Sequence, residues 1–270
     1  MAFTGWGDAA GAASSGALLT LRARRLFRVG ALDSERFQVF TKARPLVRLR
    51  GGQRHVQWPD PVLLAGRAAG AERDVVVLVA AEPALRWREF AREVAEQWTR
   101  LGGGLVVLLG AFLGDSLHVG PVPMIGAGST PELGMLLRAC GVGRNRYEGP
   151  VSALTPIYEA CTDRGLECVN LWAAVPHYLA GVPNPKVAAA LVRTIHRLTG
   201  IGDDAADLER AAASFEATLN QRLALRRAGK TPDLAVDVVG DLPTVEDAIR
   251  QVERLLGLHP EEPPDAGRSG

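Results

Sequence analysis

The sequence has few cysteines, and none is placed as a disulfide framework or a metal site requires. Of its 270 residues only Cys140, Cys161 and Cys168 are cysteines, and no two of them form a C-x-x-C pair. An odd count without such a pair argues against a disulfide framework and against a zinc site. All three lie in apolar surroundings, so we expect small core residues and no bound metal.

The sequence also lacks an excess of charge of one sign and lacks long apolar runs. Lys and Arg number 31 and Asp and Glu number 30, and the net charge of +1 does not indicate a nucleic-acid-binding protein. No run approaches the roughly 18 apolar residues of a membrane span. The first residues lack the basic start and apolar core of a signal peptide. These absences predict no nucleic-acid or membrane partner and, by default, a cytoplasmic location.

No assembled catalytic motif is present. There is no G-x-S-x-G turn, no Walker-type loop, no H-E-x-x-H pair and no G-x-G-x-x-G after a strand. The nearest pattern is Gly126–Thr130, where backbone N–H groups before a helix could surround an anion and make Gly128 and Ser129 ligand-binding residues. Small residues are also common at helix starts, so packing is the simpler alternative. We expect no cofactor.

Buried strands alternate with amphipathic helices through the middle of the chain. Strands are predicted over 74–80, 105–109 and 168–173, with a short extended piece at 121–125. Helices are predicted over 86–101, 131–140, 150–164 and 184–199. Trp87, Phe90, Val94 and Trp98 form one apolar stripe. Unbroken β-branched strands between helices predict an α/β fold in three layers with a mainly parallel sheet.

The first 60 residues are less regular. Met1–Thr4 resembles the end of a strand, which predicts that the chain starts inside its first strand, and a helix is predicted over 9–26. The basic cluster Arg22, Arg24, Arg25 and Arg28 would then surround this helix and its exit, either as a solvated surface or as an anion or partner site. Alternating residues in 37–58, with Gly51-Gly52 between them, predict a hairpin of exposed strands.

The last 70 residues contain no strand pattern. A long charged helix is predicted over 203–227, a shorter one over 244–256, and disorder from His259. The expected division is a core domain over 1–201, a helical extension over 202–258 and a tail over 259–270.

Several short strings together resemble the proteasome-assembly-chaperone-2 family in its actinobacterial branch, over roughly residues 1–225. They are Phe3–Ala10, Glu82-Pro83 with Trp87, Leu109–Ala111, Asp115 and His118 before Pro121–Pro123, Arg146–Pro150, Leu171–Tyr178 and Pro183–Lys186. The resemblance implies a three-layer α/β/α fold like that of nucleoside phosphorylases and hydrolases. It also implies homo-oligomers, with the trimer as one form, and proteasome subunits as partners. Two departures are Gly7, where the family has Asn, and Val119-Gly120, where it has Thr-Arg.

Four predicted strand exits hold the candidate catalytic residues. Ligands of open α/β sheets bind beyond the carboxyl ends of the strands, which selects Asp8, Glu82, His118 and His177. Asp8 and Glu82 could equally cap helices, Glu82 at the helix from Arg86. Each histidine could act as an acid or base, or could bond to backbone in a tight loop.

Further candidate ligand-binding residues surround these exits. Gly5 and Trp6 lie in the first turn, and Asp115 and Tyr178 lie beside the histidines. Glu148 could bind a ribose hydroxyl or a helix start, and Asn184 is expected chiefly as a helix cap.

Two functions remain open from the sequence. One is a non-catalytic protein-binding or assembly factor, and the other is a nucleoside phosphorylase-like or hydrolase-like enzyme. An open crevice lined by the four candidates would favour the enzyme. A crevice filled by Trp6, Trp172 or Tyr178 would favour the assembly factor.

Overall fold

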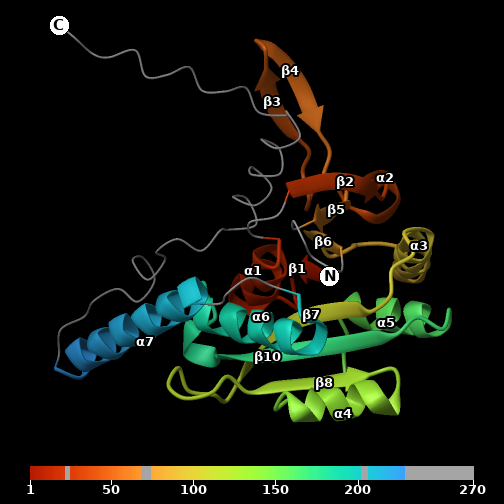
Figure 1. The fold of residues 1–270 in the computed structure, drawn as a ribbon. Helices are drawn as coiled ribbons and strands as arrows, with labels where there is room; N and C mark the ends of the chain where they lie inside the picture. Colours follow the sequence, from red (N-terminus) through yellow and green to blue (C-terminus); the bar gives the residue numbers. More distant parts are fainter. Residues whose placement is uncertain (22–24, 68–73, 202–205, 229–270) are drawn as a thin grey trace, which may run out of the picture.

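The computed structural model describes residues 1–21, 25–67, 74–201 and 206–228 (Figure 1). The strands are β1 (Ala2–Thr4), β2 (Arg25–Ala31), β3 (Leu46–Arg50), β4 (Gln53–Gln57), β5 (Val62–Arg67), β6 (Val75–Ala81), β7 (Val106–Gly114), β8 (Met124–Gly128), β9 (Gly143–Arg144) and β10 (Cys168–Pro176). The α-helices are α1 (Ala12–Leu19), α2 (Ser34–Phe37), α3 (Trp87–Arg100), α4 (Pro131–Ala139), α5 (Leu154–Thr162), α6 (Pro185–Thr199) and α7 (Ala206–Arg227). Short 3-10 helices η1 (Ala9–Gly11) and η2 (His177–Leu179) follow two of the strands.

The strands form two four-stranded sheets that β1 joins. Their orders are β1-β6-β5-β2 and β7-β10-β8-β9. The amino group of Met1 donates to the carbonyl of Val107 at 2.6 Å, and the Leu109 N–H donates to the Met1 carbonyl at 2.8 Å. Therefore β6, β1, β7 and β10 run parallel and side by side, and their carboxyl ends meet at one edge.

The pairing outside these four strands corrects the prediction of a mainly parallel sheet. β5 runs antiparallel to both β6 and β2, and β8 runs antiparallel to β10. The α/β class is confirmed, and the topology is mixed. One cause is that β5 ends at Arg67 and β6 begins at Val75, a connection too short for the crossover that a parallel neighbour needs.

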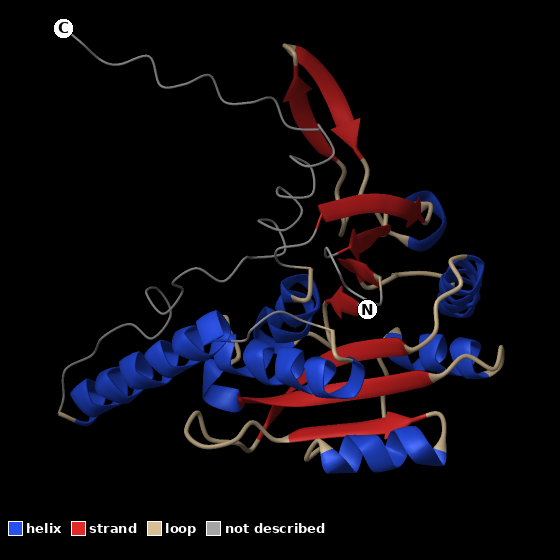
Figure 2. Ribbon diagram, in the orientation of Figure 1, coloured by secondary structure: helices blue, strands red, loops and turns tan. Residues whose placement is uncertain are grey.

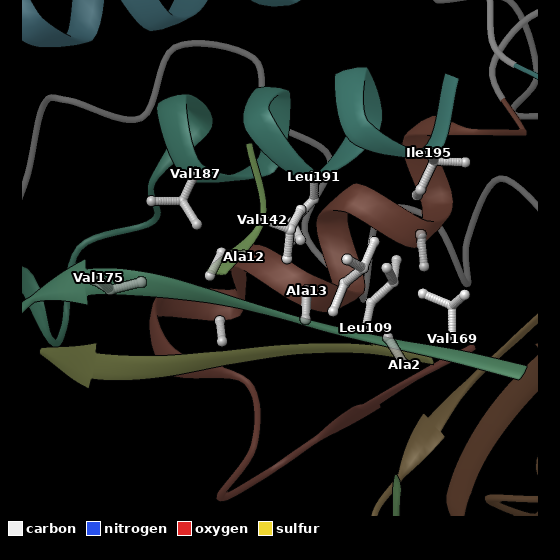
Figure 3. Packing of buried hydrophobic residues seen from close by; sticks show 14 of the residues in the cluster. Ala2, Ala12, Ala13, Leu109, Val142, Val169, Val175, Val187, Leu191 and Ile195 are labelled. Atoms are coloured by element: carbon white, nitrogen blue, oxygen red, sulfur yellow. The ribbon is translucent and has the colours of Figure 1, made fainter. Parts of the chain in front are cut away.

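Helices cover both faces of the strands. Leu109 and Val169 point into a cluster with Ala13 of α1 and Leu191 of α6 (Figure 3). The intervening residues, such as Leu108, point into a second cluster with α3 and α5. This alternation follows from the period of two along a strand, and it explains why both faces of β7 and β10 are apolar.

Several local predictions are confirmed. Phe90, Val94 and Trp98 of α3 are buried, and Trp87 is half-buried. The helix predicted over 131–140 is α4, and Thr130 caps it by accepting from the Leu133 N–H. All three cysteines are free and buried.

The region around residue 25 was predicted wrongly. The helix expected over 9–26 ends at Leu19, and Arg25 begins strand β2. Arg28 therefore lies in a strand, while Arg22 and Arg24 lie outside the described residues. The Ala- and Leu-rich run gives a helix-like composition, whereas β2 forms through long-range pairing with β5, which the sequence pattern did not reveal.

Phe37 is a second correction. It was assigned to an exposed strand, but it ends the short helix α2 and is fully buried. Its ring packs edge-on against Phe90 with 5.1 Å between centroids. Asp33 starts this helix by accepting from the Glu35 N–H, and the burial of Phe37 gives the turn its packing energy.

The hairpin itself is confirmed and projects from the rest of the molecule as a two-stranded ribbon of β3 and β4 (Figure 2). Gly51 and Gly52 have φ of 55° and 80°, which a two-residue hairpin turn requires at both positions.

Helix α7 lies along α6, and its Phe215 and Leu219 belong to the same core cluster as α1. The helix predicted over 244–256 and the tail from His259 lie outside the described residues, so the division into domains stays a prediction. No helix within the described residues is both long enough and apolar enough to cross a membrane.

Candidate functional site at the carboxyl edge of the parallel strands

The four central strands end at Thr4, Ala81, Gly114 and Pro176. Because these strands are parallel neighbours, their exit loops lie at one edge of the sheet. All four candidate catalytic residues stand in those loops. The four residues therefore lie on the same side of the molecule, where ligands of open α/β sheets bind.

Asp8 caps the start of helix α1. The residue is buried, with 9% of its surface exposed. Oδ1 accepts the N–H groups of Ala13 and Ser14 at 2.8 and 3.1 Å, and Oδ2 accepts the Ser14 hydroxyl at 2.6 Å. Burial raises the pKa of this carboxyl, and the hydrogen bonds from Ser14 and Ala13 oppose that shift. The carboxylate is thus occupied by helix capping, one of the two roles that the sequence left open.

Glu82 caps a helix as well, but a different one from that expected. Its Oε1 accepts the N–H of Ala153 at 2.7 Å, at the start of α5. Helix α3, which the sequence suggested, starts from Arg86 without a side-chain cap. A Cβ placed on Gly5 would lie 3.4 Å from Glu82, so the first loop packs directly against this carboxylate.

The indole of Trp172 packs closely against Gly110 of β7 and lies near Gly7 of the first exit loop. A Cβ on Gly110 would lie 2.4 Å from the ring, and a Cβ on Gly7 would lie 3.3 Å from it and 3.1 Å from Ser152. Ser152 is itself buried and accepts the Leu154 N–H at the start of α5. Of the three side chains that could have filled a crevice, Trp172 does so, while Trp6 is exposed.

His118 is held in a hydrogen-bonded network. The hydroxyl of Tyr178 accepts the backbone N–H of His118 at 2.8 Å and lies 2.8 Å from its Nδ1. The Nε2 atom lies 2.9 Å from Oδ1 of Asn220 in α7. Each of these hydrogen bonds has one donor and one acceptor when the Tyr178 hydroxyl donates to Nδ1 and the Nε2–H of His118 donates to Asn220. Both ring nitrogens of His118 are then used.

Lys186 completes this network. Its ammonium donates to the His118 carbonyl at 2.6 Å and pairs with the Glu216 carboxylate of α7. The Lys186 side chain is 15% exposed and that of Glu216 32% exposed, so the pair is largely removed from water. The exit loop after β7 is therefore tied to α7 at two points.

Replacing Lys186 with methionine is expected to lower the free energy of unfolding by about 1–3 kcal/mol, because Glu216 loses its partner in a partly buried place. Limited proteolysis should then cut α7 first. Arg193→Met is the matched control, because Arg193 also pairs with an α7 carboxylate, Glu209, but at half-exposed side chains. Arg193→Met should lower the free energy of unfolding by less than about 1 kcal/mol. Equal effects of both changes would contradict this account.

The remaining exit-loop candidates face solvent. Nε2 of His177 lies 3.7 Å from Oδ1 of Asp115, and both side chains are well exposed. Glu148 is exposed too. Among the described residues, no three His, Cys, Asp or Glu side chains gather as a metal site would require.

Gly128 and Ser129 do not belong to this edge. Strand β8 is antiparallel to β10, and Gly128 pairs with Val169 near the beginning of β10. A Cβ on Gly128 would lie 2.5 Å from Leu133, and Ser129 bonds to the backbone of Cys168. Close packing therefore explains this glycine. The sequence could not reveal the location because strand direction depends on long-range pairing.

Asn184 has the structural role that the sequence favoured. Its Oδ1 accepts the Val187 N–H at 3.2 Å, and its side chain is buried at the start of α6.

A cavity of 560 Å³ lies at the opposite, amino-terminal edge of the same strands. Met1, Val76, Trp98 and Val107 contribute to its lining. None of the sequence-selected candidates lines it.

Exposed apolar side chains gather at this edge, and only Trp6 and Tyr178 of them were predicted from the sequence, as ligand-binding candidates. They lie in or beside the exit loops of the four parallel strands, and we call them the exit surface: Trp6, Leu85, Leu113, Leu117, Val119 and Tyr178. Trp6 is 61% exposed and Leu117 is 69% exposed. Leu117 and Val119 between the polar loop residues were the available signal, since exit loops are usually polar. An exposed apolar group of this kind is typical of a protein interaction site.

Comparison with known proteins places this fold. The model of the PAC2 family matches residues 2–223. The proteasome-assembly chaperone homologue Rv2125 of Mycobacterium tuberculosis is 33% identical, with a TM-score of 0.74 over 83% of this chain and 94% of that one. A PAC2 family protein of Streptomyces avermitilis is 36% identical, with a TM-score of 0.74 over 84% and 96%.

More distant structures share the fold alone. The archaeal proteasome-assembly chaperone homologue PbaA of Pyrococcus furiosus is 16% identical, with a TM-score of 0.57 over 85% of this chain and 95% of that one. No curated protein matches the sequence. The family model covers most of the chain, and two solved structures exceed 30% identity, so the chain belongs to the PAC2 family.

Proposed function

We propose that this protein is a non-catalytic binding and assembly factor that acts through the exit surface. One observation carries the proposal. Three of the four candidate catalytic residues, Asp8, Glu82 and His118, are bonded within the protein, while Trp6 and Leu117 beside them are exposed. Exposed anchors of this kind at a surface otherwise fixed by hydrogen bonds suit recognition of a protein.

The partner that the relatives suggest is a proteasome subunit. Rv2125 and PbaA are described as homologues of proteasome-assembly chaperones, and PbaB of Pyrococcus furiosus as an archaeal proteasome activator. In this proposal the protein works in the cytoplasm as a homo-oligomer, with a trimer as the first state to test. Its phosphorylase-like and hydrolase-like α/β/α layers serve as a scaffold for binding.

The arrangement gives no comparable support to a nucleoside phosphorylase-like enzyme. Such an enzyme needs a crevice that admits a base and a sugar next to an available acid or base. Trp172 occupies the space beside Gly110, Gly7 and Ser152. Val119 and Gly120 also stand where a family arginine could have held an anion.

A reconstitution experiment tests the assembly role. Purified proteasome α subunits of the same organism are mixed with the protein, and complexes are followed on native gels. We expect a complex that is lost with Trp6→Ser combined with Leu117→Ser. It should be kept with Met135→Ser, because Met135 is 55% exposed on α4, away from the exit surface. A failure of the unchanged protein to bind any subunit would overturn the proteasome role.

A further inference from the structure

One segment of the chain carries a large excess of positive charge. Residues 22–67 contain 11 Lys and Arg against 3 Asp and Glu, a net charge of +8. The rest of the chain contains 20 Lys and Arg against 27 Asp and Glu, a net charge of −7. The overall charge of +1 is therefore the sum of two unlike parts. It predicts no nucleic-acid partner only when this separation is ignored.

The basic side chains of this segment gather at one end of the molecule. Strands β2, β3 and β4 lie at that end, and the ribbon of β3 and β4 projects from it (Figure 1). Five exposed or half-buried residues there form what we call the basic lobe: Arg28, Lys42, Arg44, Arg48 and Arg54. Within the described residues, none of these five forms an ion pair with a carboxylate.

Two of the three acidic residues in the segment are occupied elsewhere. Asp33 accepts the Glu35 N–H, and Asp60 accepts the N–H and the hydroxyl of Ser34, all at the start of α2. The one remaining basic residue of α2, Arg36, pairs with carboxylates of α3. The lobe therefore keeps its positive charge for a ligand from outside.

An aromatic pair lies at the base of the ribbon. Trp58 directly follows β4 and is 45% exposed, and its ring centroid lies 5.1 Å from that of Phe40. Phe40 thus supports the indole while much of Trp58 stays open to solvent. Cationic groups next to an open aromatic ring are typical of proteins that bind single-stranded nucleic acid, where cations contact phosphates and bases stack on the ring.

The ribbon itself favours a nucleic acid over a protein. The face that holds Val47 and Val56 also holds Arg54, which is the cross-strand partner of Leu49. These few apolar side chains offer far less than the roughly 800 Å² per partner of a stable protein interface. Cations must then supply most of the binding energy. Phosphate contacts do so through the release of counterions, without a large apolar area.

We infer that the basic lobe binds single-stranded nucleic acid, with phosphates on Arg44, Arg48 and Arg54 and a base on Trp58. Unpaired bases expose the faces that stack on an indole, whereas a duplex hides them. Charge and stacking are common to all nucleotides, so binding is independent of base sequence, and RNA and DNA share this chemistry. Figure 1 shows the ribbon projecting away from the ends of β7 and β10. The lobe is thus separate from the exit surface, and the inference does not rest on the proposed function.

Fluorescence anisotropy of labelled oligonucleotides tests the inference. The full chain is titrated into oligo-U RNA and oligo-dT DNA of about 20 nucleotides, longer than the sites of known single-strand binders. We expect dissociation constants of roughly 1–100 μM near physiological salt. The logarithm of the affinity should fall with the logarithm of salt concentration with a slope of about −2, since each of three phosphate contacts contributes about −0.7. The ratio of the two affinities shows whether the lobe prefers RNA or DNA.

Arg44→Ser combined with Arg54→Ser should weaken binding at least about tenfold and make the slope shallower by about 1.4, because two phosphate contacts are lost. The matched control is Arg138→Ser combined with Arg164→Ser. It removes the same charge from exposed residues of α4 and of the turn after α5, and binding should stay within about twofold of the unchanged protein.

Trp58→Ala separates stacking from charge. It should weaken binding about fivefold or more and leave the salt slope unchanged, because a base loses its ring while every phosphate contact remains. Circular dichroism checks that each variant is folded.

Four results would overturn the inference. The first is no binding of either oligonucleotide at about 50 mM salt, where phosphate contacts are strong. The second is an equal loss of affinity in the lobe variant and its control. The third is tighter binding of a duplex of the same length. The fourth is equally tight binding of polyglutamate of the same length, which would indicate an acidic protein as the partner.

Discussion

Asp8→Ala is expected to lower the free energy of unfolding by about 2–4 kcal/mol. The change removes the acceptor for two N–H groups at the start of α1 and for the Ser14 hydroxyl, all in a buried place. Loss of a helix cap costs about 1–2 kcal/mol, and each buried donor left without a partner adds to that. Urea denaturation measures the difference. A loss below about 0.5 kcal/mol would contradict the capping role.

Asp8→Asn is the matched control, because the amide oxygen still accepts the N–H groups. It should cost less than the alanine change, and it should alter the pH dependence of stability. Burial raises the pKa of Asp8 in the folded state, so the folded protein holds this proton more tightly than the unfolded chain does. Stability from Asp8 is therefore highest in acid and falls as pH rises from about 4 through the raised pKa. Asp8→Asn should remove this loss of stability with rising pH. A pH dependence of stability equal to that of the unchanged protein would contradict the raised pKa of Asp8.

Gly110→Val is expected to destabilise the protein by about 3 kcal/mol. A Cβ at this position would lie 2.4 Å from the ring of Trp172, and Gly7 and Ser152 close off the ring at another side. Overpacking of a filled site costs about 1–3 kcal/mol, and the branched side chain adds further overlap. The measurement is thermal or urea unfolding of the variant beside the unchanged protein.

Trp172→Leu provides the control for that prediction. It opens space at the same place, so Gly110→Val should cost at least 1 kcal/mol less in the Trp172→Leu background. Gly104→Val controls for valine alone, because no atom lies within 4 Å of a Cβ there. Additive effects of Gly110→Val and Trp172→Leu would show that the ring does not fill the space between Gly7 and Gly110.

Local signals were sufficient for much of the fold. The strands β6, β7 and β10 were predictable because both of their faces are buried, which leaves unbroken apolar runs. The caps at Thr130 and Asn184 were predictable because a cap bonds within three residues of itself. The short strand β2 was not, because Arg25–Ala31 becomes a strand only through pairing with β5.

The roles of the candidate site residues were also beyond what local sequence patterns can predict. The strand-exit rule correctly predicted that Asp8, Glu82 and the two histidines lie at one edge of the sheet. The bonds that decide their roles join distant parts of the chain: Glu82 to Ala153, and His118 to Asn220. Contacts over 71 and 102 residues leave no local pattern. Leu85, Leu113, Leu117 and Val119 of the exit surface carry no polar group, so a rule for catalytic and ligand-binding residues does not select them.

The most direct test of the central claim asks what touches the exit surface. A photoreactive phenylalanine analogue takes the place of Leu117 in the full chain, and a second chain carries it in place of Met135. Illumination in cells should give a covalent adduct with a protein from position 117 and little from position 135, as measured by gel shift and mass spectrometry. Absence of any protein adduct from position 117, while the protein stays folded, would contradict the claim that this edge binds a protein.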